Sequence, residues 1–185
     1  IASCLVGSEM CIRDRIVRFE RPSGGEEAVA EAARLLSQAR FPVILSGAGV
    51  VLSGAIGDLV QLAERLDAPV CSNYQHNDSF PGSHPLAMGP LGYNGSKAAM
   101  EIIAQADVVL ALGTRLNPFS TLPGYGMSYW PQDARIIQVD INPDRIGLTK
   151  KVSVGIVGDA GKVARGILGQ LAPRAEGCLL YTSPS

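Results

Sequence analysis

The sequence predicts an α/β fold in which helices cover a doubly wound, open parallel sheet of five or six strands. Short apolar runs without polar alternation recur along the chain, which is typical of strands buried on both faces of a parallel sheet. Segments with helical periodicity lie between these runs, and 185 residues are enough for one domain with a real core. The predicted strands are 42–45, 68–72, 107–112, 135–140 and 152–157.

The first strand runs directly into a glycine turn, Ser46-Gly47-Ala48-Gly49, and then into a helix. Glycines let the backbone turn sharply and let a ligand approach it, and free N–H groups at a helix start can hold an anion. The turn therefore indicates a nucleotide-type site, with a plain strand-to-helix turn as the alternative. Position 52 is Leu, so G-x-G-x-x-G is absent, and no acid ends the second strand at residue 73, which counts against an NAD dehydrogenase.

The helical segments have recognisable start signals. Segment 25–39 repeats apolar residues at helical spacing, and Ser23 with Glu26 predicts a capping box at its start. A second helix is expected to open at about residue 50 and to continue over 58–66.

Further along the chain, Ser96 is expected to cap a helix and Asp159 to cap the last one, which runs to about residue 171. Pro143 is placed to start a short helix. Segments 73–94 and 117–132 read as long irregular loops, and such loops are usually functional or pack against another domain.

Composition excludes several classes of partner and site. Lys+Arg number 16 against Asp+Glu 17, without a basic stripe, so neither nucleic acid nor a membrane is an expected partner. The four cysteines form no C-x-x-C pair, which suits a reducing cytoplasm. His76, Asp78 and His84 match no common zinc spacing, and no G-x-S-x-G elbow supports hydrolase chemistry.

Candidate binding residues follow the predicted strands, because ligands of open parallel sheets bind at the carboxyl ends of the strands. Asp140 is placed to bind a ribose or an amine, or to cap the turn before Pro143. Arg115 is placed to stack on a ring, to hold a phosphate, or to form a salt bridge on the sheet rim. The candidates are Gly47, Gly49, Gly113, Thr114, Arg115, Asp140, Ile141, Asn142 and Asp159.

The order of several motifs carries a resemblance to a known family. The run FPGSHPLAMGPLGYNGSKAAMEIIAQADVVLALGTRLNPFS, then IIQVDINPDRIG, then VSVGIVGDA, resembles the central domain of thiamine-diphosphate-dependent enzymes of the acetolactate synthase type. Within that family the loops QHNDSFPGSHPL, GPLGYNGSKAAM and GTRLNPFSTLPGYGMSYWP look most like the sulfoacetaldehyde acetyltransferases. The resemblance covers 19–171. Segments 1–15 and 178–185 resemble translated sequencing adapters, or are disordered ends.

The resemblance implies a three-domain protein, a homodimer or homotetramer, of which pyrimidine- and pyrophosphate-binding domains are missing here. Thiamine diphosphate and Mg²⁺ would be held by those domains, since Gly158-Asp159-Ala160 only superficially matches the family's Gly-Asp-Gly metal motif. The chain would then carry no catalytic or metal-binding residue. The implied reaction converts sulfoacetaldehyde and phosphate to acetyl phosphate and sulfite.

In some relatives the central domain holds FAD or an adenine nucleotide, and the nine candidate residues match the strand-end positions of that site. Asn117-Pro118 stands where acetolactate synthases have two acids, which weakens the expectation of FAD. Two alternatives remain: the FAD-binding domain of an acetolactate synthase large subunit, and a non-catalytic nucleotide-binding module.

Overall fold

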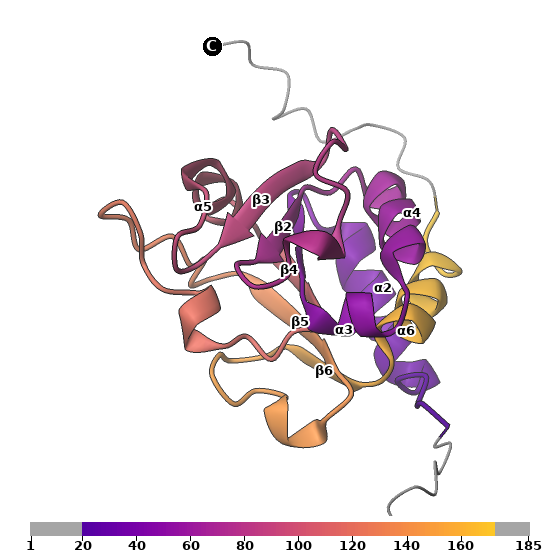
Figure 1. Cartoon of the computed structure of the whole chain (residues 1–185). Coiled ribbons are helices and arrows are strands. Elements are labelled where there is room, and N and C mark those ends of the chain that lie inside the picture. Colours follow the sequence, from indigo (N-terminus) through magenta and orange to yellow (C-terminus); the bar gives the residue numbers. More distant parts are fainter. Residues whose placement is uncertain (1–19, 173–185) are drawn as a thin grey trace, which may run out of the picture.

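The computed structural model describes residues 20–172, which form one six-stranded sheet with helices on its faces (Figure 1). All strand pairs are parallel, and the strand order is β3-β2-β1-β4-β5-β6. The strands are β1 (Pro42–Ser46), β2 (Val70–Asn73), β3 (Ala87–Leu91), β4 (Val108–Leu112), β5 (Arg135–Asp140) and β6 (Val154–Val157). The helices are α2 (Glu26–Gln38), α3 (Ala48–Leu52), α4 (Ile56–Leu66), α5 (Lys97–Ile103) and α6 (Ala160–Leu168).

The chain winds outward from the middle of the sheet in two directions. It passes from β1 to β2 and β3 on one side, and then from β4 to β5 and β6 on the other. The strand order therefore reverses between β1 and β4, whose full register pairs Pro42 with Val108 and Ser46 with Leu112. In open parallel sheets this reversal opens a crevice beyond the carboxyl ends of the two strands.

The two faces of the sheet are covered differently. Helices α2, α4 and α6 pack together on one face, where their apolar side chains meet those of β1, β4 and β5 (Figure 1). The other face is covered by α5 and by the loop after β4, whose Leu116 and Tyr129 are buried there. The strands β1 and β4 are buried along their whole length, because side chains on both faces are covered.

Most predicted elements are confirmed. The five predicted strands and the helix over 25–39 lie within a residue or two of their expected bounds. Ser96 caps α5 by accepting a hydrogen bond from the Ala99 amide, and Pro143 begins a short 3₁₀ helix, Pro143–Arg145. The segments 1–15 and 178–185 lie outside the described residues.

The predicted capping box at Ser23 is wrong. Gly25 is the N-cap of α2 and no side chain caps that end. Ser23 instead forms an antiparallel bridge with Gly158, and Gly24 adopts a φ of +95° so that the chain passes between β6 and α6. A tertiary pairing thus replaces the local cap that the sequence pattern favours.

Two further expectations are corrected. Segment 73–94 is not irregular throughout, because β3 lies within it and pairs with β2 at the sheet edge. The helix expected from residue 50 to 66 is two helices, α3 and α4, interrupted where Gly54 adopts a φ of +66°. Within residues 20–172, no helix is long and apolar enough to cross a membrane.

Candidate functional site

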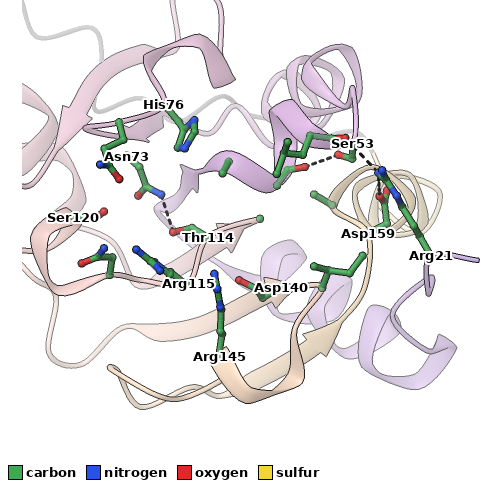
Figure 2. A pocket seen from close by; sticks show the side chains of 18 residues that line it. Arg21, Ser53, Asn73, His76, Thr114, Arg115, Ser120, Asp140, Arg145 and Asp159 are labelled. Atoms are coloured by element: carbon green, nitrogen blue, oxygen red, sulfur yellow. Dashed lines mark hydrogen bonds and ion pairs between the residues drawn. The ribbon is translucent and has the colours of Figure 1, made fainter. Parts of the chain in front are cut away.

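A cavity of about 390 Å³ lies at the carboxyl edge of the sheet, where the strand order reverses (Figure 2). Its wall is built from the segments that follow β1, β2, β4, β5 and β6, together with one residue ahead of α2. The lining residues are Arg21, Ala48, Gly49, Leu52, Ser53, Asn73, Gln75, His76, Gly113, Thr114, Arg115, Asn117, Ser120, Asp140, Ile141, Arg145, Asp159 and Ala160.

Seven of the nine predicted residues line this cavity: Gly49, Gly113, Thr114, Arg115, Asp140, Ile141 and Asp159. Gly47 and Asn142 are not part of the lining. Asn142 caps the 3₁₀ helix that begins at Pro143, and its Oδ1 accepts a hydrogen bond from the Asp144 amide at 2.9 Å. That the lining residues bind a ligand stays a prediction.

The glycines at the cavity floor, Gly49 and Gly113, and the neighbouring Gly47 are required by protein packing. The Gly49 amide donates to the Gly113 carbonyl at 2.8 Å. A Cβ on Gly113 would lie 2.7 Å from Gly49 Cα, and Gly113 has a φ of +63°, which disfavours other residues. A Cβ on Gly47 would lie 2.7 Å from Thr114 Cβ. These glycines let α3 start directly against the end of β4, which fixes the shape of the floor.

Asn73 is a site residue that the sequence analysis did not select. It ends β2, is 8% exposed, and its Nδ2 donates to Thr114 Oγ1 at 2.8 Å. Its Oδ1 is buried and has no hydrogen-bond partner. A buried acceptor without a donor is costly, so this oxygen is an unfavourable feature of the cavity wall.

Asp140 has the capping role that the sequence left open, and its binding of a ligand stays a prediction. Its Oδ1 accepts a hydrogen bond from the Asn142 amide at 2.9 Å, which stabilises the turn after β5. The residue is 8% exposed and also lines the cavity. A carboxylate oxygen accepts more than one hydrogen bond, so Asp140 can hold the turn and receive a ligand hydroxyl or amine.

Two arginines supply positive charge at the same side of the cavity as Asp140 (Figure 2). Arg115 follows β4 and Arg145 ends the 3₁₀ helix after β5. Within residues 20–172 neither guanidinium has a hydrogen-bond or ion-pair partner, and both side chains are exposed. They are free to meet an anionic ligand, and a guanidinium matches a phosphate in a bidentate manner.

Asp159 lines the opposite end of the cavity, and both of its carboxylate oxygens make structural contacts. Its Oδ1 accepts hydrogen bonds from the amides of Gly161 and Lys162, both at 3.1 Å, and so caps α6. Its Oδ2 forms an ion pair of 2.9 Å with Arg21 Nη1. Burial alone would raise the pKa of Asp159, but the hydrogen bonds from Arg21 and Lys162 outweigh it and hold that pKa below its usual value.

Arg21 was also missed, because it lies in a short segment ahead of α2 and reaches the cavity only through the fold. Besides Asp159, its Nη1 donates to the Leu52 carbonyl at the end of α3, at 3.3 Å. Arg145 was missed although it stands in the INPDR turn that follows a predicted strand. That position was a usable signal, since the turn after a central strand faces the same edge.

The sequence model of the family "Thiamine pyrophosphate enzyme, central domain" matches residues 29–167. The chain belongs to this family. The resemblance seen in the sequence is thereby confirmed, as is the α/β fold.

Individual relatives refine the comparison. The chain is 76% identical over 161 residues to the "Probable sulfoacetaldehyde acetyltransferase" of Rhizobium meliloti, a match that covers 87% of this chain and 27% of that protein. It is 74% identical over 161 residues to the sulfoacetaldehyde acetyltransferase of Roseovarius nubinhibens, again 87% and 27%. The "Probable acetolactate synthase large subunit" of Methanocaldococcus jannaschii is 40% identical over 143 residues, 77% of this chain and 24% of that protein.

Among solved structures, benzoylformate decarboxylase from Polynucleobacter necessarius superposes with a TM-score of 0.69 at 24% identity, covering 86% of this chain and 30% of that one. This likeness shows the shared fold. The chain thus spans about 27% of the length of these two sulfoacetaldehyde acetyltransferases.

The family name contains thiamine pyrophosphate, and a diphosphate is commonly held in a protein through Mg²⁺. Residues 20–172 contain no group of three or more His, Cys, Asp or Glu side chains arranged to hold a metal ion. His76 and His84 lie in separate pairs, with Asp78 and Glu64 respectively. The residues at hand therefore do not fit a metal-bound diphosphate, and no chemical step is assigned to them.

Proposed function

We propose that this chain is the central domain of a thiamine-diphosphate-dependent sulfoacetaldehyde acetyltransferase. The single observation that carries the proposal is the identity of 76% over 161 residues to one such protein, against 40% over 143 residues to an acetolactate synthase subunit. The match covers 161 residues and therefore includes loops as well as strands, and loops are where related enzymes of one fold diverge in function.

In the proposed reaction the longer protein breaks the carbon–sulfur bond of sulfoacetaldehyde, and sulfite leaves with the bonding electron pair. The former aldehyde carbon is oxidised to the acyl level while its neighbour becomes a methyl group, so no external oxidant is needed. A phosphate oxygen then forms the new bond to the acyl carbon, which gives acetyl phosphate. Thiamine diphosphate, with Mg²⁺, supplies the carbanion chemistry when bound.

We assign the catalytic and metal-binding residues to the pyrimidine- and pyrophosphate-binding domains, and we predict that this chain alone is inactive. The domain bounds 19–171, a homodimeric or homotetrameric enzyme and a cytoplasmic location are parts of the same proposal. No role for nucleic acid or a membrane is proposed.

The cavity is proposed as a nucleotide pocket. Its position at the strand reversal, the unpaired Arg115 and Arg145 and the nearby Asp140 support a ligand with phosphates and a ribose. A volume of about 390 Å³ suits one nucleotide better than the whole of FAD. We therefore favour an adenine nucleotide, with FAD as the ligand of the alternative, an acetolactate synthase subunit.

The test compares substrates on the longer, purified protein with thiamine diphosphate and Mg²⁺. Sulfoacetaldehyde with phosphate is expected to release sulfite, whereas pyruvate alone is expected to give little acetolactate. Acetolactate as the faster product would replace the proposal by the alternative. No turnover of either substrate, by a protein that binds thiamine diphosphate, would overturn both.

A further inference from the structure

Four exposed apolar side chains come from the loops that follow β3 and β4. Tyr93 is 59% exposed, Phe119 56%, Leu122 37% and Tyr125 66%. We call these four residues the aromatic patch. Large apolar side chains at this exposure are costly in water, and when they gather on two adjacent loops they mark a contact surface.

The two loops are fixed to each other by backbone contacts. The Tyr93 amide donates to the Phe119 carbonyl at 2.9 Å, and Tyr125 Oη donates to the Gly95 carbonyl at 3.1 Å. A Cβ on Gly92 would lie 2.1 Å from the Phe119 carbonyl oxygen, so only glycine permits this approach. The two loops that carry the aromatic patch are therefore held side by side, although they are far apart in the sequence.

Further contacts within the domain fix the positions of Phe119 and Tyr93. Asn117 Oδ1 accepts a hydrogen bond from the Phe119 amide at 2.9 Å, and Ser120, beside it, is 3% exposed. The rings of Tyr74 and Tyr93 meet edge to face, with 6.4 Å between their centroids. A surface that is already ordered loses little conformational entropy when a partner binds, which favours a stable interface.

The composition of the patch also fits an interface. It contains three aromatic residues and no charge, and aromatic residues are enriched while charged ones are depleted at the centres of protein interfaces. Leu116 and Tyr129 of the same loop are buried against the sheet. The loop after β4 thus has an inner apolar side that packs against the sheet and an outer apolar side that is exposed.

We infer that the aromatic patch docks another domain of the same polypeptide. The inference rests on the proposed function, because the chain spans only 27% of its relatives and belongs to a family of central domains, so most of the protein's surface lies elsewhere. Asn117 and Ser120 line the nucleotide pocket on either side of Phe119. The docked domain therefore borders the pocket as well.

The experiment measures the accessibility of this surface to a thiol reagent in the longer protein. Phe119→Cys and Tyr125→Cys variants are labelled with a maleimide, and the labelled peptides are quantified by mass spectrometry. Gln61→Cys is the matched control, because Gln61 is exposed on the outer side of α4. Each rate is divided by the rate for the same peptide in denaturant.

Both patch cysteines are expected to react at least about tenfold more slowly than the control, because labelling then requires the interface to open. The protection should persist on dilution to concentrations at which chains no longer associate. Labelling as fast as the control would overturn the inference. Protection that disappears on dilution would overturn it too, and would assign the patch to a second copy. Since no substrate is present, this outcome is independent of whether sulfoacetaldehyde is turned over.

Discussion

Arg21 and Asp159 form an ion pair of 2.9 Å that joins the segment before α2 to the first turn of α6, across 138 residues of sequence. Asp159 makes this contact with Oδ2 and caps α6 with Oδ1. The two carboxylate oxygens therefore have separate structural roles, which separate substitutions can test.

Asp159→Ala should destabilise the chain more than Asp159→Asn. The alanine removes both the cap and the ion pair, and loss of a cap costs about 1 to 2 kcal/mol. The asparagine keeps an oxygen for the amides of Gly161 and Lys162 and loses mainly a partly exposed ion pair, worth about 1 kcal/mol or less. Urea unfolding of the 185-residue chain measures both changes. Equal losses would show that the cap contributes nothing.

The stability of the chain should fall in acid because of the same pair. The pKa of Asp159 is lower in the folded chain than in the unfolded one, so its stabilisation is complete above the unfolded value of about 3.9. It is lost as the pH falls through the folded pKa. Arg21→Gln should make the unfolding free energy less dependent on pH below about pH 4. An unchanged acid dependence would contradict this coupling.

Gly113→Ala should be far more damaging than Gly126→Ala. Both glycines have positive φ, +63° and +71°, and share the backbone strain of about 1 to 2 kcal/mol that alanine meets there. A Cβ on Gly113 would also lie 2.7 Å from Gly49 Cα, whereas one on Gly126 meets nothing within 4 Å. Urea unfolding should give a loss for Gly113→Ala at least about 2 kcal/mol larger. Equal losses of stability would mean that α3 can move away from residue 113 without cost.

The sequence predicted five of the six strands and missed β3, which lies at the edge of the sheet. Strand β4 reads VVLAL and can be recognised without tertiary information, because a continuous apolar run has no solvent face. Strand β3 reads AMGPL, is mostly half-buried, and lies at the sheet edge, where proline and glycine are tolerated. Only pairing with β2 makes it a strand, and pairing is not local.

The site residues likewise fall into some that the sequence could predict and some that it could not. Residues directly after the strands, such as Gly49, Thr114 and Asp140, were predictable because parallel strands end at one edge. Arg21 was not, because its place depends on the bridge between Ser23 and Gly158. The expected cap at Ser23 failed for the same reason, since the tertiary bridge outcompeted a local hydrogen bond.

Cys71 should be unreactive in the folded chain. It is fully buried under α5, and burial raises the pKa of its thiol to about 12, so almost no thiolate exists at pH 8. Iodoacetamide at that pH should modify Cys71 only after urea is added, as read by mass spectrometry of its peptide. Rapid modification without urea would show that β2 opens readily.

The proposed nucleotide pocket predicts a charge-dependent affinity. Arg145→Gln should weaken ADP binding about tenfold or more, because a hydrogen bond between charged groups contributes about 1.5 to 3 kcal/mol. Arg34→Gln is the control, since Arg34 pairs with Glu31 on the outside of α2. Isothermal titration of the longer protein with ADP, and separately with FAD, gives the affinities. If both substitutions have the same effect, or if neither ligand binds, the cavity is not a nucleotide pocket.

The most direct measurement is the product balance of the longer protein with sulfoacetaldehyde and phosphate. Sulfite and acetyl phosphate should form in equal amounts, and acetyl phosphate should disappear when phosphate is omitted. Sulfite without acetyl phosphate in the presence of phosphate, or acetolactate from pyruvate as the main product, would contradict the assignment of this chain to a sulfoacetaldehyde acetyltransferase.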